Sequence, residues 1–134
     1  MLEHISLCHK NHEYDSPSCA DVSMWISKLF DIEFKGKEIL VKQIKNSKYE
    51  LINGNGFISV KFLTNEEKEE FPFTVRVPVE MIASQPDRHP IMFLLHVLDG
   101  IVNELEIYTA DSSLIDKEIS VLNVEHKVAD ILKD

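Results

Sequence analysis

The feature that most constrains the fold is a nearly continuous apolar run that ends in a tight-turn signal. Residues 91–98 are apolar apart from His96, and Asp99-Gly100 follows them directly. An Asp-Gly pair favours the positive φ angles of a two-residue hairpin turn, so the chain is expected to reverse there. A strand with one wet face usually alternates, so this run predicts a central strand covered on both faces.

The segment after the turn, residues 101–109, alternates between apolar and polar side chains as a half-buried strand does. Its inner side is apolar: Ile101, Leu105 and Ile107. Its outer side carries two carboxylates and a phenol beside one valine: Val102, Glu104, Glu106 and Tyr108. The two runs therefore predict an antiparallel hairpin whose second strand displays polar groups on its outer face.

Three further segments outline the rest of a sheet. Residues 49–52 and 57–62 flank the tetrapeptide Asn-Gly-Asn-Gly, which predicts a second hairpin. Residues 73–79 alternate as a half-buried strand, with Pro78 at a sheet edge or at the strand end because proline has no N–H to donate. Residues 85–90 are framed by prolines and predict a loop.

Helical spacing of apolar residues is clearest in the first third of the chain. Residues 22–30 predict a helix that Asp21 can cap, and residues 39–46 predict a second helix after Gly36. We expect residues 1–20 to form a loosely ordered arm, 114–122 a short strand, and 124–132 a closing helix. The sequence predicts one α+β domain over residues 1–134, with two N-terminal helices packed on a mainly antiparallel sheet of about five strands.

The net charge of -9 is distributed unevenly along the chain. Residues 1–61 carry eight acidic and eight basic residues, whereas residues 62–134 carry fifteen acidic and six basic residues. An acidic half repels phosphate, which disfavours direct binding to nucleic acid or to anionic lipid. The same charge attracts a basic protein partner, although it also serves solubility alone.

No apolar stretch approaches the roughly 20 residues of a membrane-spanning helix. The N-terminus lacks the basic start and apolar run of a secretory signal. The two cysteines, Cys8 and Cys19, do not make a disulfide framework. These features predict a cytoplasmic protein.

Cysteine and histidine residues are concentrated in the N-terminal arm. His4, Cys8 and His12 would share one face if the arm were helical, and Cys19 could complete a four-ligand zinc site. The spacing matches no established zinc motif, so an arm with incidental histidines remains the simpler interpretation.

Other catalytic or cofactor chemistry finds little support in the sequence. Cys8 beside His9 lacks a readable orienting group, and none of the four glycines belongs to a phosphate-binding motif. Glu104 and Glu106 on one wet strand face would share the same surroundings, whereas an acid/base pair needs differing ones. His96, inside the apolar run, is interpreted as a core histidine. We therefore expect a protein that is not an enzyme and that has no cofactor.

Two parts of the chain resemble a known group of proteins. Residues 91–100 and 103–111 resemble a segment in which an apolar strand passes through Asp-Gly into Leu-Glu-Ile-Tyr and an acidic loop. Residues 25–30 and 34–37 resemble the start of the same proteins. They are similar to small bacterial α+β proteins that we identify with toxin-immunity proteins, including those of contact-dependent growth inhibition.

This resemblance implies binding and neutralisation of one cognate toxin domain, commonly a basic nuclease of the RNase type. A contact patch on this chain follows from composition, because tyrosine flanked by carboxylates is typical of interface hot spots. The candidate residues are Glu104, Glu106, Tyr108 and Asp111. The alternatives are a metal-binding module or enzyme that uses the N-terminal arm, and an acidic housekeeping domain with no toxin partner.

Overall fold

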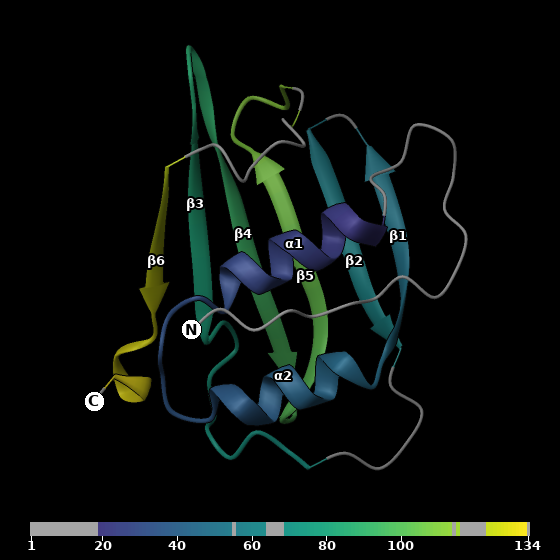
Figure 1. The fold of residues 1–134 in the computed structure, drawn as a ribbon, viewed down its shortest axis with the longest axis vertical. Coiled ribbons are helices and arrows are strands. Elements are labelled where there is room, and N and C mark those ends of the chain that lie inside the picture. The colour runs from purple at the N-terminus through teal and green to yellow at the C-terminus, as the bar shows by residue number, and fades with distance from the viewer. Residues whose placement is uncertain (1–18, 55, 64–68, 114, 116–122, 134) are drawn as a thin grey trace.

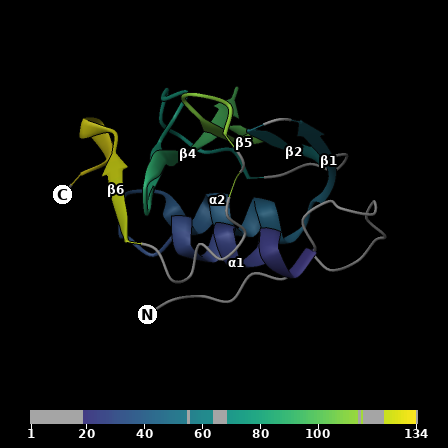
Figure 2. The ribbon, with the colours of Figure 1, turned by 90° about the horizontal axis from the view of Figure 1, so that it is seen from above.

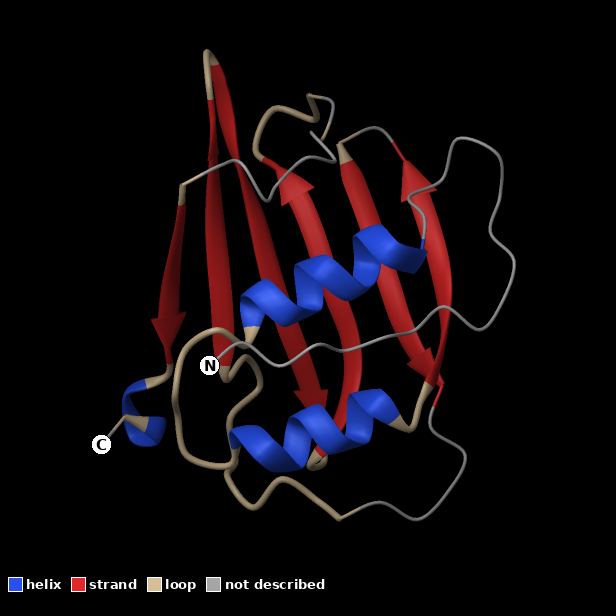
Figure 3. Cartoon of the chain, viewed as in Figure 1, coloured by secondary structure: helices blue, strands red, loops and turns tan. Residues whose placement is uncertain are grey.

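The computed structural model describes residues 19–54, 56–63, 69–113, 115 and 123–133 (Figure 1). These ranges contain two helices, six strands and one short 3-10 helix (Figure 3). Their bounds are α1 Cys19–Leu29, α2 Lys37–Lys45, β1 Lys48–Gly54, β2 Phe57–Leu63, β3 Val79–Gln85, β4 Arg88–Leu98, β5 Ile101–Thr109, β6 Val124–Val128 and η2 Asp130–Leu132. The α+β class is confirmed, and the sheet has six strands where about five were expected.

The two helices form where the apolar spacing predicted them, but α1 begins at Cys19, so Asp21 lies in its first turn and is not its cap. Three- and four-residue spacing places the apolar side chains of α1 on one stripe, and each is at most 1 % exposed: Val22, Trp25, Ile26 and Leu29. Helix α2 begins after Gly36, whose φ of 81° lies in the left-handed region that glycine tolerates best. Neither helix is long and apolar enough to span a bilayer.

All paired strands of the sheet are antiparallel, in the order β1-β2-β5-β4-β3-β6. The predicted hairpins β1–β2 and β4–β5 are both present. Asp99 and Gly100 take φ values of 52° and 80°, which is the geometry that the Asp-Gly signal predicted. The strand order places β5 and β4 in the two middle positions of the sheet.

The structure corrects three predictions made from residues 73–132. The expected loop at 85–90 is the tip of a hairpin, because β3 ends at Gln85, β4 begins at Arg88, and Asp87 turns with a φ of 56°. Of the expected strand at 73–79, only Val79 belongs to β3. The expected helix at 124–132 is strand β6 followed by η2, because residues 124–128 pair with β3.

Two other expectations concern segments that the structure largely leaves undescribed. Residues 19 and 20 of the predicted arm begin α1, and the remainder of the arm lies outside the described residues. The predicted strand at 114–122 also lies outside them, apart from residue 115.

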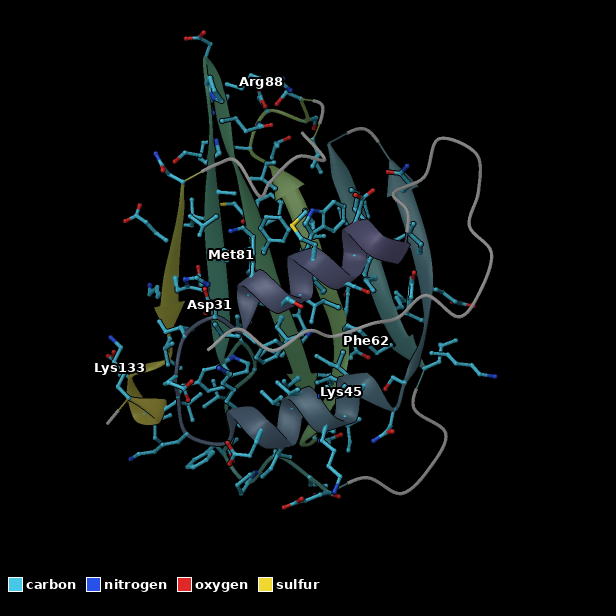
Figure 4. The ribbon with its side chains drawn as sticks, in the orientation of Figure 1. Asp31, Lys45, Phe62, Met81, Arg88 and Lys133 are labelled. Atoms are coloured by element: carbon cyan, nitrogen blue, oxygen red, sulfur yellow. The ribbon has the colours of Figure 1, made fainter. Side chains whose placement is uncertain are left out.

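Both helices cover the same face of the sheet and run across its strands (Figures 1 and 2). We call this the inner face. Its core side chains include Phe62 and Met81, which Figure 4 labels, and the adjacent pair Phe93 and Trp25, whose rings meet edge-on with centroids 6.1 Å apart. These side chains pack the helices onto the strands and make one continuous core.

Within the described ranges, helices cover only one face of β4, which contradicts the prediction of a strand covered on both faces. Its burial alternates: Ile91, Phe93 and Leu95 are buried on the inner face, whereas Met92, Leu94 and His96, the residues that alternate with them, are half-buried. Two helices are enough to cover one face of this sheet, and no described helix or strand lies over the other, which we call the outer face (Figure 2).

A buried glutamine attaches α2 to the end of the sheet. The Gln43 amide nitrogen donates to the backbone carbonyls of Glu69 and Gly100, at 2.7 Å and 2.9 Å. Its carbonyl oxygen accepts the backbone N–H of Val102 at 2.8 Å. One side chain thus holds the β4–β5 turn and the start of β5 against α2. These hydrogen bonds fix the position of that end of the sheet relative to the helix.

Candidate functional site: the outer face of the sheet

A row of large side chains crosses four strands on the outer face. The strand register sets Phe57 opposite Tyr108, Tyr108 opposite Met92, and Met92 opposite Ile82. Directly opposed residues of antiparallel strands point to the same face with Cβ atoms roughly 5 Å apart. All four are half-buried, and we call them the apolar row.

A second set of side chains lies one step along the strands from the apolar row. The register places Ser59 opposite Glu106, and Glu106 opposite Leu94. Ile52, which lies opposite Ser59 on β1, is 47 % exposed. The outer face therefore mixes apolar side chains with polar ones, in contrast to the apolar inner face.

Both outer carboxylates of β5 are hydrogen-bonded within the face. The His96 ring donates from Nε2 to Glu106 Oε1 at 2.8 Å, while its Nδ1 accepts from Arg76 Nε at 3.2 Å. The Ser59 hydroxyl donates to Glu104 Oε2 at 2.5 Å. Because Nδ1 accepts a bond, the ring proton of His96 sits on Nε2 in this arrangement.

The position of His96 corrects its interpretation as a core histidine. Its side chain is on the outer face with 15 % of its surface exposed, and both ring nitrogens have partners. The sequence did hold a signal for this, since Met92, Leu94 and His96 fall on every second position of β4. The apolar character of Met92 and Leu94 obscured that alternation.

The structure brings three of the four candidate contact residues together. Glu104, Glu106 and Tyr108 project from the same face of β5 at the middle of the sheet. Asp111 follows the end of that strand in an exposed turn, with an oxygen 3.7 Å from His89 Nε2 on β4. Residues Phe57, Met92 and Ile82, which complete the surface around Tyr108, were not singled out by the sequence.

The Asp111 carboxyl is stabilised in its charged form. Its pKa is lowered, first by the neighbouring Ser113 hydroxyl, then by the Ser113 N–H, and further by the charge of His89. Of the two Ser113 groups, the N–H makes the well-formed hydrogen bond, 3.1 Å to Oδ1. Asp111 is therefore a fixed negative charge at the border of the sheet.

Two lysines on the outer face lie opposite carboxylates in the strand register. Lys61 lies between Glu50 and Glu104 on its two neighbouring strands, and Lys127 lies opposite Glu80. The acidic excess of the second half of the chain is instead found near the turns. Exposed carboxylates at the β4–β5 end form what we call the acidic rim: Glu69, Glu70 and Asp99.

A groove of about 730 Å³ lies beside this rim. The segment from Glu70 to Arg76 forms one wall, and the β4–β5 turn from Val97 to Gly100 forms the other. Phe71 and Phe73 stack at a tilt in the first wall, with ring centroids 5.3 Å apart. The groove thus offers apolar surface at the end of the sheet where the carboxylates gather.

Metal binding gains no support from the described part of the chain, where no group of three or more His, Cys, Asp or Glu side chains is placed to hold an ion. The proposed ligands His4, Cys8 and His12 lie outside the described residues, and Cys19 is the first residue of α1. The zinc hypothesis for the arm stays a prediction.

No protein-family model, curated protein or solved structure matches this chain.

Proposed function

We propose that this chain is an immunity-type protein that binds a basic toxin domain, of the nuclease kind, with the outer face of its sheet. The observation that carries the proposal is the apolar row on a sheet face that no described helix or strand covers. Contiguous apolar surface with a polar border is the usual composition of a protein–protein interface. Tyr108 stands at its middle, and tyrosine is among the residues enriched at interface hot spots.

The charge distribution supports a basic partner. Asp111 follows Tyr108 by three residues and the exposed Glu125 lies opposite Ile82, so negative charge borders the apolar row, while the acidic rim lies at the other end of β5. Charge at the border of an interface accelerates encounter with an oppositely charged partner. A nuclease domain needs a basic cleft for its phosphate substrate, and such a cleft is complementary to this border.

The first experiment asks whether the partner exists. The gene next to the one that encodes this chain should encode a large secreted protein, and its C-terminal domain should be toxic when expressed alone. Co-expression of this chain should restore growth, and the two purified proteins should form a complex in isothermal titration calorimetry. A metabolic operon at that position, or a toxic domain that this chain neither binds nor neutralises, would rule out the proposal.

A charge-matched pair of variants then tests the surface. Glu104→Lys with Glu106→Lys places two positive charges on the outer face and should weaken the complex at least tenfold, because like charges then oppose the basic partner. Glu33→Lys with Glu38→Lys makes the same change in net charge at exposed positions on the helix side and should leave the affinity within about threefold. Equal losses in both variants would mean that net charge alone matters and that the outer face is not the contact surface.

A further inference from the structure

The middle of the outer face has little charge to offer a partner. Glu106 is engaged by His96 and Glu104 by Ser59, and Glu50 and Glu80 face lysines across the strands, whereas the exposed Glu125 lies on the edge strand β6, opposite Ile82. A cation from a partner would have to share or displace these bonds, and it would lose its own hydration on arrival. Attraction at this centre must therefore come chiefly from the apolar row.

We propose that the outer face accepts an apolar, preferably aromatic, side chain of its partner on the apolar row, while the partner's basic residues meet the acidic rim. The identity of the partner rests on the function proposed above, but the chemistry of the contact rests on this face alone. In such a contact the apolar row and the acidic rim have different roles. The apolar row sets how long the complex lasts, and the rim sets how fast it forms.

The dimensions of the apolar row suit such a contact. Neighbouring strands lie about 4.8 Å apart, so four strands give a row about 14 Å long, enough to seat one or two aromatic rings. Tyr108 is flanked by Phe57 on one side and Met92 on the other. Aromatic rings and a thioether make favourable contacts with an incoming ring, and methionine adapts its shape to it.

The outer face adjoins the groove that lies beside the acidic rim. Arg76 contacts His96 on the outer face and also lines the groove, so the two surfaces adjoin. Leu98, 40 % exposed, lies between them at the end of β4. A partner segment that leaves the row toward the rim would thus cross Leu94 and the Glu106–His96–Arg76 hydrogen bonds before it reaches Leu98 and the groove.

The first test needs no toxin. The chain contains four methionines, of which Met92 lies in the apolar row and Met81 lies on the inner face with no exposed surface. With methyl-labelled methionine, titration with N-acetyl-tryptophanamide should shift the Met92 methyl signal in a saturable way and leave Met81 unchanged. N-acetyl-argininamide should shift Met92 by less than one third as much. A larger response to the arginine probe, or no response to either, would overturn the proposal.

The second test uses the toxin domain once the complex is shown. Tyr108→Ala and Met92→Ala should each raise the dissociation rate at least tenfold with little change in the association rate. Glu104→Gln and Glu106→Gln, which keep the shape but remove the charge, should change the dissociation rate less than threefold. The reverse ranking would overturn the apolar contact while the immunity function stood, whereas absence of a complex would remove the function and leave the methionine result to decide the contact.

Discussion

The inner and outer faces of the sheet are built from the same strands but differ in what their side chains do. On β4 the inner residues Phe93 and Leu95 are at most 1 % exposed, whereas the outer residues Met92 and Leu94, which alternate with them, are only half-buried. The inner face is covered by α1 and α2 and stabilises the fold. The outer face has apolar side chains of similar size without a described cover, and the proposed binding function rests on this difference.

The sharpest test of this difference is a pair of adjacent substitutions on one strand. Phe93→Ala should lower the free energy of unfolding by about 3–5 kcal/mol, because it leaves a cavity beneath Trp25. Met92→Ala, one residue away on the outer face, should cost only about 1 kcal/mol, because water already reaches this side chain. Urea denaturation followed by circular dichroism measures both, and equal losses would mean that the outer face is covered as well.

The next largest effect concerns a polar side chain on the covered side. Gln43→Ala removes the partner of one buried N–H and two carbonyls at the end of the sheet, which should cost about 1–3 kcal/mol. Lys42→Ala, the exposed neighbour on the same helix, should change stability by less than about 0.5 kcal/mol. A Gln43 variant as stable as the Lys42 variant would show that the amide does not hold the β4–β5 turn.

A polar network on the outer face should be worth less. His96→Ala also breaks two side-chain hydrogen bonds, to Glu106 and Arg76, but both partners can turn to water. We expect a loss of about 0.5–1 kcal/mol in the free energy of unfolding, at the lower end of what a hydrogen bond contributes. A loss that matches that of Gln43→Ala in the same urea titration would contradict the assignment of His96 to an open face.

The smallest expected effect is the pH dependence at Asp111. Its pKa is lower in the folded state than in the unfolded chain, so its contribution is present above the unfolded value of about 3.8 and is lost as the pH falls through the folded value. The carboxyl signal of Asp111 in NMR should therefore titrate below 3.8. Asp111→Asn should be slightly less stable than the native chain at pH 6 and equally stable at pH 2; a difference that persists at pH 2 would assign the effect to shape.

Much of the fold was predictable where local chemistry decides it. The stripe of apolar residues on α1 and the Asn-Gly and Asp-Gly turns act within a few residues, so their structures agree with the prediction. Strand β6 was predicted as a helix because five residues cannot establish a period. Its pairing with β3 supplies the backbone hydrogen bonds that make it a strand, and that partner lies about 45 residues away in the chain.

The candidate site was predictable only along one strand. Alternation on β5 placed Glu104, Glu106 and Tyr108 on one outer face, and the structure agrees. For Ile101 and Val102 the prediction is wrong: Val102 is buried in the core and Ile101 is half-buried, because the register shifts at His96 and Val97. The neighbours that complete the surface come from β2, β3 and β4, and their register with β5 cannot be derived from any single segment. The bonds that already occupy the two carboxylates depend on the same register.

The sequence by itself determined two N-terminal helices, two tight hairpins, an acidic second half and the polar outer side of β5. Each of these depends on composition or on neighbours a few residues apart. The tertiary structure alone decided which face of the apolar strand β4 the helices cover. Apolar side chains occupy both faces of that strand, and only the number and placement of the covering helices distinguish core from open surface. Because the helices cover the other face, the polar side of β5 lies at the middle of the outer face, beside the apolar row.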